Sequence, residues 1–303
     1  MCAIGKSYKL LIPDKIKVLI LMKSTTLYKI LPNIVNFLTT LSVKKAAIKL
    51  RTTNTKRILV DNSVLGHSVT HETAWISTGK QPWGDQKIDT GYTARIPVRS
   101  ENDTSVIANS VKYLPGIANL AKRGLMLLAT SQELEDERFT QPTGRFRGYG
   151  ICDFSPFSDL KFEMIDDSEG SIVIASSYPG TPSIETQRKK RLESKTDPLY
   201  RKLVSVLGPK NSQDAWHIVT AEHNNCYCFL TMDFKLVRNI RAQSKNATIK
   251  SLKTKILTPE EFGKELGIIP MSPRLYSYHN ADYPVRHDIN WPDSKRRKHR
   301  KRE

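Results

Sequence analysis

The sequence predicts an α/β fold in which a mostly parallel central sheet is flanked by helices. Four short apolar segments have the length and composition of buried strands, and segments of helical character alternate with them. This alternation is typical of parallel sheets, because each helix carries the chain back across one face of the sheet. The expected strands are residues 57–60, 125–129, 226–230 and 253–257.

Six further segments favour helix. Their apolar residues recur at roughly helical spacing, as on the buried face of a helix. The most informative of them follows Ser212, which can cap a helix, and ends at Asn224 and Asn225. Another contains Pro115, which we expect to kink it. The six segments are residues 64–78, 104–123, 131–137, 198–207, 213–223 and 259–266.

Glycine- and proline-rich stretches near residues 79–102 and 141–196 interrupt this pattern, so we expect insertions there. The first is expected to be loop with a short strand, and the second to hold a strand at 172–175. A chain of 303 residues that is 39% apolar can bury one core plus extensions. We therefore expect a basic extension over 1–56, a core domain over 57–266, and a proline-containing linker with a basic tail over 267–303.

The chain is strongly basic. Its 48 Lys and Arg against 30 Asp and Glu give a formal charge of +18, which favours a polyanionic partner, nucleic acid above all. Seven of these cations lie in the tail from Lys295 to Glu303, which we expect to be disordered and either to contact RNA or only to aid solubility. The four cysteines form no disulfide-dense pattern, which favours a reducing compartment and hence the cytoplasm.

The amino-terminal segment is basic and partly amphipathic. Between Asp14 and Asp61 it contains ten Lys and Arg and no acid. Its longest apolar run, residues 18–22, is far shorter than the roughly 20 residues that a membrane span needs, so we expect no span. A helix around residues 26–41 would contact RNA or a membrane surface, or be only an appended element, and Met22 stays open as an alternative start.

Four acidic residues are expected to meet at one edge of the sheet. Asp61, Glu133 and Asp233 fall at or just past the carboxyl ends of expected strands, and Asp214 begins a helix that can face the same edge. Clustered carboxylates repel one another unless a cation joins them, and an all-oxygen ligand set favours Mg²⁺ or Mn²⁺. One acid after a strand is often only a turn residue, so the set of four carries the inference of a metal site suited to phosphate chemistry.

Two other groups offer an alternative zinc chemistry: His217 and His223 with Cys226 and Cys228, and His67 with His71. A Cys-x-Cys pair inside an apolar strand is more typical of core packing, and no second cysteine pair completes a tetrahedral site. The segment HSVTH has the i, i+4 spacing of a helical metal site but lacks the glutamate of the zinc protease motif. We therefore expect no zinc.

The chain resembles the PIN-domain nucleases over residues 57–266. The segments that carry the resemblance occur in the family's order: ILVDNSVL, LLATSQELEDE, QDAWHIVTAE, FLTMD and TKILTPEEF. The resemblance implies a PIN-like three-layer fold and a cluster of acids that holds one or two Mg²⁺ or Mn²⁺ ions and cuts RNA. By position these acids are Asp61, Glu133, Asp214 and Asp233.

The chain departs from the family pattern in two respects. Glu135 and Glu137 are close rivals to Glu133, because the intervals around it are longer than in compact members. Many members also carry another acid shortly after the last aspartate, where this chain has residues 234–236, Phe-Lys-Leu. A second metal is therefore expected to be held weakly. Four short polar residues beside the acids could orient carboxylates or water, or only cap strand ends: Asn62, Ser63, Ser131 and Thr231.

The sequence thus predicts a metal-dependent endoribonuclease that uses a metal-activated water, of a toxin or RNA-processing type. The alternative is a PIN-like protein that binds RNA without cutting it, and the presence of all four acids favours the enzyme. Two further partners stay open: an antitoxin protein and a second copy of the chain.

Overall fold

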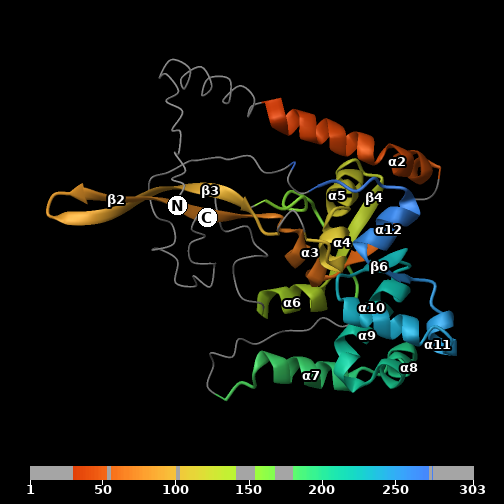
Figure 1. The fold of residues 1–303 in the computed structure, drawn as a ribbon. Helices are drawn as coiled ribbons and strands as arrows, with labels where there is room; N and C mark the ends of the chain where they lie inside the picture. Colours follow the sequence, from red (N-terminus) through yellow and green to blue (C-terminus); the bar gives the residue numbers. More distant parts are fainter. Residues whose placement is uncertain are drawn as a thin grey trace, which may run out of the picture.

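The structure is a computed structural model that describes residues 30–52, 56–99, 103–140, 154–167, 180–272 and 275. Its centre is a sheet of five parallel strands in the order β5-β4-β1-β6-β7 (Figure 1). The central strand β1 pairs Ile58 with Leu128 of β4 on one side and with Cys228 of β6 on the other. The strands are β1 (Lys56–Val60), β4 (Met126–Ser131), β5 (Glu163–Ile165), β6 (Cys228–Leu230) and β7 (Lys255–Leu257).

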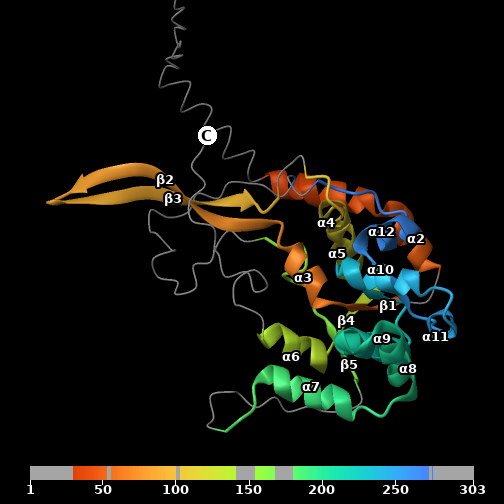
Figure 2. The ribbon, with the colours of Figure 1, turned by 60° about the horizontal axis from the view of Figure 1, so that its bottom comes forward.

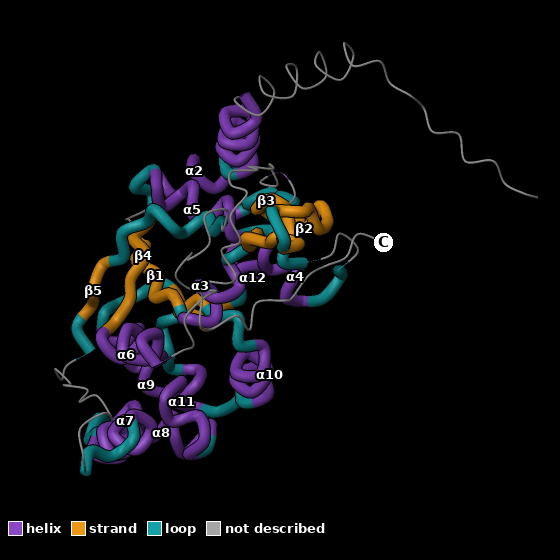
Figure 3. Tube along the Cα trace, turned by 90° about the vertical axis from the view of Figure 1, so that its left-hand side faces the viewer, coloured by secondary structure: helices purple, strands orange, loops and turns teal. Residues whose placement is uncertain are grey.

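Helices cover both faces of this sheet (Figures 1 and 3). They are α2 (Lys44–Arg51), α3 (Asn62–Ser68), α4 (Val106–Val111), α5 (Leu114–Lys122), α6 (Gln132–Thr140), α7 (Ile184–Ser194), α8 (Pro198–Leu207), α9 (Ser212–His223), α10 (Phe234–Ala242), α11 (Ala247–Lys250) and α12 (Pro259–Leu266), with a 3-10 turn at Pro209–Asn211. The expected α/β class with a parallel sheet flanked by helices is therefore confirmed.

The alternation of side chains along β1 divides the core in two. Ile58 and Val60 belong to a cluster that includes residues of α2, α5 and α12, whereas Leu59 belongs to a second cluster with residues of α8 and α9. Successive residues of a strand point to opposite faces, so a strand buried on both faces is apolar throughout. The arrangement is consistent with three layers.

Several expected elements have different bounds. Residues 64–78 are not one helix, since α3 ends at Ser68 and a strand follows, in keeping with the β-branched and aromatic residues there. The helix expected over 104–123 is two helices, and Pro115 lies in the first turn of the second, where no intrahelical amide partner is needed. Helix α9 begins at Ser212 itself, after Asn211, and no side chain caps it. The strand expected at 172–175 lies outside the described residues.

A long hairpin takes the place of the first expected insertion. Strands β2 (His71–Trp83) and β3 (Gln86–Pro97) pair antiparallel and project away from the sheet (Figures 1 and 2). At the base of the hairpin, His71 forms a bridge with Phe154. The hairpin lies between α3 and α4 in the chain and so lengthens the interval between Asp61 and α6.

The amino-terminal extension is part of the core from residue 30 onward. A helix over 30–42 leads into α2 with a break at Val43, and Val43, Ala46 and Leu50 are buried in the first cluster. None of the described helices is both long and apolar enough to cross a membrane. The basic tail from Lys295 lies outside the described residues.

Candidate functional site

Asp61 ends the central strand and is held by two hydroxyl groups. Its backbone amide donates to the carbonyl of Leu230 at 2.9 Å, which continues the pairing of β1 with β6. Its carboxylate oxygen Oδ2 accepts hydrogen bonds from Ser63 at 2.5 Å and from Thr231 at 2.6 Å. Both bonds go to the same oxygen, Oδ2. Two of the four expected supporting residues thus orient Asp61.

Asp233 follows the neighbouring strand β6 and caps α10. Its Oδ1 accepts the backbone amides of Lys235 at 2.8 Å and Leu236 at 3.0 Å. The Thr231 hydroxyl that donates to Asp61 also accepts the amide of Asp233 at 2.9 Å. Thr231 therefore couples the two aspartates, and the loop between β6 and α10 is fixed relative to the end of β1.

Asp214 lies in the first turn of α9 and is the most perturbed acid of the site. The pKa of its carboxyl is raised to about 6, mainly by burial; the negative charges of Asp61, Asp233 and Glu137 add to the rise, and His217 opposes it. An influence of this kind on Asp214 requires the three other acids to lie near it. Asp61, Asp214 and Asp233, expected to converge from three separate motifs, form one electrostatic cluster.

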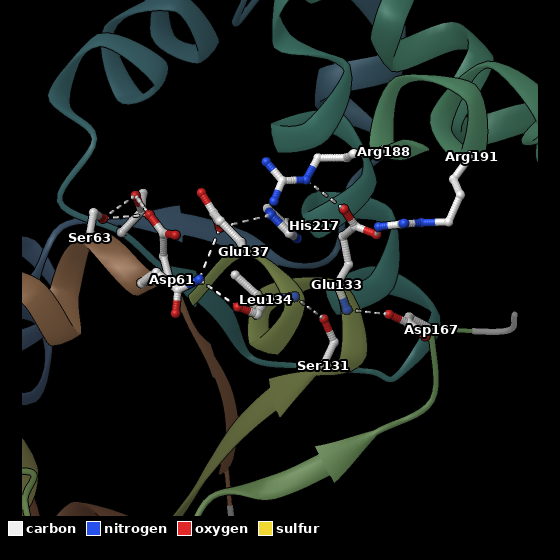
Figure 4. A network of polar contacts seen from close by, with 12 residues as sticks. Asp61, Ser63, Ser131, Glu133, Leu134, Glu137, Asp167, Arg188, Arg191 and His217 are labelled. Carbon is white, nitrogen blue, oxygen red and sulfur yellow. Dashed lines mark hydrogen bonds and ion pairs between the residues drawn. The ribbon is translucent and has the colours of Figure 1, made fainter. Parts of the chain in front are cut away.

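The glutamate that joins this cluster is Glu137 of α6. Its Oε2 accepts a hydrogen bond from the side-chain amide of Asn62 at 3.0 Å and lies 3.8 Å from Nε2 of His217 (Figure 4). Asn62 is buried and also donates to the carbonyl of Leu134 at 2.7 Å. The first residue of α3 therefore ties α6 to the end of β1 and fixes the position of Glu137.

Glu133 has a different environment. It is 4% exposed, and its two oxygens face α7, where Arg191 Nη2 lies at 2.9 Å and Arg188 Nε at 3.4 Å. Arg191 also reaches Asp136 at 3.7 Å. Figure 4 shows Glu133 directed at these arginines while Glu137 is directed at His217. The carboxylate of Glu133 is therefore neutralised within the protein and ties α7 to α6.

The choice between the two glutamates depends on contacts that sequence does not reveal. Glu133 and Glu137 are one turn apart on the same helix, so their spacing alone gives them the same face. They differ in their partners: Asn62 contacts Glu137, whereas the arginines of α7 contact Glu133. These partners come from segments that are distant in the chain. The third rival, Glu135, pairs with Arg138 at 2.7 Å on the surface of α6.

Two supporting roles differ from those that the sequence indicates. His217, on the same helix as Asp214, is 2% exposed and contacts the ring of Phe229 as well as Glu137. The sequence suggests it only as a zinc ligand, although its position three residues after Asp214 places it on the same side of α9. Ser131 receives the amide of Leu134 at 3.5 Å and so helps to begin α6.

The alternative zinc residues do not gather. Cys226 and Cys228 are buried in opposite core clusters, and burial raises the pKa of both thiols, that of Cys226 to about 11. Such thiols stay protonated and are poor metal ligands. His67 lies at the end of α3 and His71 in strand β2, so they do not share a helical face.

The donor set suits a hard divalent cation. It consists of carboxylates, whose charges add to the effect of burial on the pKa of Asp214, and it carries no thiol. In the described part of the chain, no three Asp, Glu, His or Cys side chains lie close enough together to hold a metal ion. No family model, curated protein or solved structure matches the chain.

Proposed function

We propose that this protein is a metal-dependent endoribonuclease with a PIN-like core. The proposal is supported by the neighbourhood of Asp214, because the charges of Asp61, Asp233 and Glu137 add to the effect of burial in raising the pKa of its carboxyl. Three of these acids follow the carboxyl ends of the adjacent strands β4, β1 and β6, where ligands gather in parallel α/β sheets. Acids that served only as turn residues would not be expected to lie close enough to act on the charge of Asp214.

Mg²⁺ or Mn²⁺ would be held by these four carboxylates. Ser63 and Thr231 occupy one oxygen of Asp61, and the amides of α10 occupy one oxygen of Asp233, so each residue can present its other oxygen. Glu137 takes the place expected for Glu133, whose charge the arginines of α7 already neutralise. The bound ion would supply Lewis acidity at a phosphodiester oxygen and lower the pKa of an attacking water.

The protein's own contribution is to fix the acids before substrate arrives. Hydroxyl groups, an amide and helix amides hold the carboxylates, which limits the reorganisation needed during reaction. Since the site offers no cysteine or free serine nucleophile among its described contacts, water is the natural attacking group. As the family resemblance implies, such cleavage would leave a 5′ phosphate and a 3′ hydroxyl.

RNA is proposed as the substrate because of charge and resemblance together. The formal charge of +18 would attract any polyanion, and the carboxylate cluster needs a cation before it can accept a phosphate. The basic tail from Lys295 would add phosphate contacts without sequence preference. Such an activity would serve either a toxin or an RNA-processing role.

The test is to incubate the purified protein with a mixture of structured and single-stranded RNAs and Mn²⁺, with and without a chelator. We expect cleavage that the chelator abolishes and added Mn²⁺ restores, with 5′ phosphate on the downstream products. Binding of RNA without metal-dependent cleavage on any RNA would instead support the inactive RNA-binding alternative.

A further inference from the structure

The two consecutive helices at the amino-terminal end of the described chain, the helix over 30–42 and α2, carry an apolar stripe that faces solvent. Its members recur three, four and seven positions apart, which places them on one side of a helix. Their exposed fractions range from 38% to 62%. The stripe consists of Ile30, Ile34, Phe37, Leu38, Leu41 and Ile48.

The opposite side of these two helices is buried against the rest of the protein. Val35, Val43 and Leu50 are 3% exposed or less, and Gly116 of α5 lies directly beneath Val43. The helices therefore cannot roll to bury the stripe without exposing an established core face. Figure 1 shows them along the outside of the molecule, on the side away from α7, α8 and α9.

The stripe extends beyond these two helices. The amide of Ile269, just after α12, donates to the carbonyl of Ser42 at 2.9 Å, and the Ile269 side chain is 62% exposed. The result is an exposed apolar surface of large aliphatic side chains and one phenyl ring, of the kind that marks an interaction site. Aliphatic side chains have no complement on an RNA backbone, so this surface is not an extension of the RNA site.

The charged residues of the segment that carries the stripe, residues 30–51, are all cations. Lys44, Lys45, Lys49 and Arg51 are exposed around Ile48, and residues 30–51 contain no acid. Lys49 donates to the carbonyl of Glu265 at 3.2 Å, so its position is fixed against α12. A second copy of the chain would place the same four cations against these ones, whereas an anionic surface would be attracted to them.

We propose that these two helices seat the protein on an anionic membrane surface. The apolar stripe would enter the boundary between headgroups and acyl chains, and the flanking cations would pair with lipid phosphates and carboxylates, as in other interfacial helices. The carboxylate cluster, which lies at the carboxyl ends of β1 and β6 and includes no residue of these helices, would stay open to solvent. Membrane contact of this kind is independent of the proposed ribonuclease activity.

The experiment is flotation of the full-length protein with large vesicles, either of phosphatidylcholine alone or containing roughly a third phosphatidylserine. We expect binding to the anionic vesicles only. Phe37→Asp should lower the partition coefficient at least about tenfold, because it places a charge in the centre of the stripe. Val106→Asp, at an equally exposed residue of α4, is the matched control and should bind as the parent does.

A pair of charge-reversal variants tests the electrostatic contribution to vesicle binding separately from the apolar one. Lys44→Glu with Arg51→Glu should abolish binding to anionic vesicles, while Arg201→Glu with Lys202→Glu, on exposed positions of α8, should leave most of it. Circular dichroism and Tm should be unchanged in all variants, since the residues are exposed. Binding that Phe37→Asp leaves intact, absence of vesicle binding, or a dimer that Phe37→Asp dissociates in the absence of vesicle binding would each overturn the proposal.

Discussion

Asn62 donates its side-chain amide to Glu137 at 3.0 Å, across 75 residues of chain, and so holds this glutamate of α6 beside the residue that follows Asp61. Asn62 is the residue next to Asp61, so the turn that positions Asp61 also positions Glu137. A second bond, to the carbonyl of Leu134, uses the other amide hydrogen of a buried side chain. The position of Glu137 relative to Asp61 therefore depends on the uncharged side chain of Asn62.

Replacing Asn62 should weaken both the fold and metal binding. Asn62→Ala removes both hydrogen bonds and leaves a buried carbonyl without its partner, which should cost about 1–3 kcal/mol in the free energy of unfolding. Removal of an orienting partner should weaken Mn²⁺ binding by roughly 10–100-fold. Denaturant unfolding and isothermal titration measure the two effects. Asn36→Ala, on an exposed helical position, is the control, and an equal effect there would show that the Asn62 bonds are not responsible.

The two glutamates should separate function from stability. Glu137→Gln should reduce cleavage at least about 100-fold with little loss of stability, because it removes charge from a repelling cluster. Glu133→Gln should do the reverse: Arg188 and Arg191 would lose their shared counter-charge, at a cost of about 1–3 kcal/mol after allowance for their partial exposure. For both variants, the cleavage rate at saturating RNA measures the effect on function, and urea unfolding measures the effect on stability. Loss of cleavage in a fully folded Glu133→Gln, with Glu137→Gln active, would restore Glu133 as the ligand.

Asp214 should make the metal-free protein less stable as the pH rises. Its pKa in the folded chain is about 6, above the value of 3.8 for an unperturbed carboxyl, so folding favours the protonated form. The stabilisation is fully present below about pH 4 and is lost as the pH rises through 6, by up to roughly 3 kcal/mol. Asp214→Asn cannot ionise and should escape this loss.

The measurement is Tm against pH in the presence of a chelator. The variant and the parent should melt together near pH 4, and the variant should melt higher at pH 7.5. A difference in Tm that does not depend on pH would mean that the carboxyl is not buried among like charges. In Mn²⁺ the order should invert, because the parent gains binding free energy that the variant lacks.

Much of this fold is predictable from local pattern, and the site only in part. Helices α8 and α12 have the predicted bounds because Pro198 and Pro259 begin them and Gly208 and Gly267 end them. These signals are local, since each lies in the helix or directly beside it. Local pattern mispredicts the hairpin of β2 and β3 because each strand is specified by its partner rather than by its own periodicity. The positions of Asp61, Asp214 and Asp233 in the fold are predictable, since each lies at its own strand end or helix start, while their role as metal ligands stays a prediction. The contacts of Glu133 and Glu137 are not predictable in this way, because they join distant segments of the chain.

The basic tail offers a test that leaves the described core intact. Deletion of Lys295–Glu303 removes a net six positive charges, and every phosphate that the tail would have neutralised then keeps its counterions. RNA affinity should fall and its dependence on salt concentration should become shallower, while cleavage at saturating RNA continues. RNA binding measured over a range of salt concentrations checks this. If the slope of affinity against salt concentration is unchanged, the tail does not contact RNA, and the amino-terminal cations become the candidates.

The central claim is that RNA cleavage takes place at the carboxylate cluster, and single-turnover cleavage of one end-labelled RNA in Mn²⁺ tests it most directly. The parent protein should be compared with Asp61→Asn, Asp214→Asn, Asp233→Asn and Glu137→Gln, each shown to be folded by its Tm and to bind RNA. We predict that every one of the four loses at least about 100-fold in rate and that the parent's product carries a 5′ phosphate. Cleavage at the parental rate in the Asp61→Asn and Asp214→Asn variants would contradict the account.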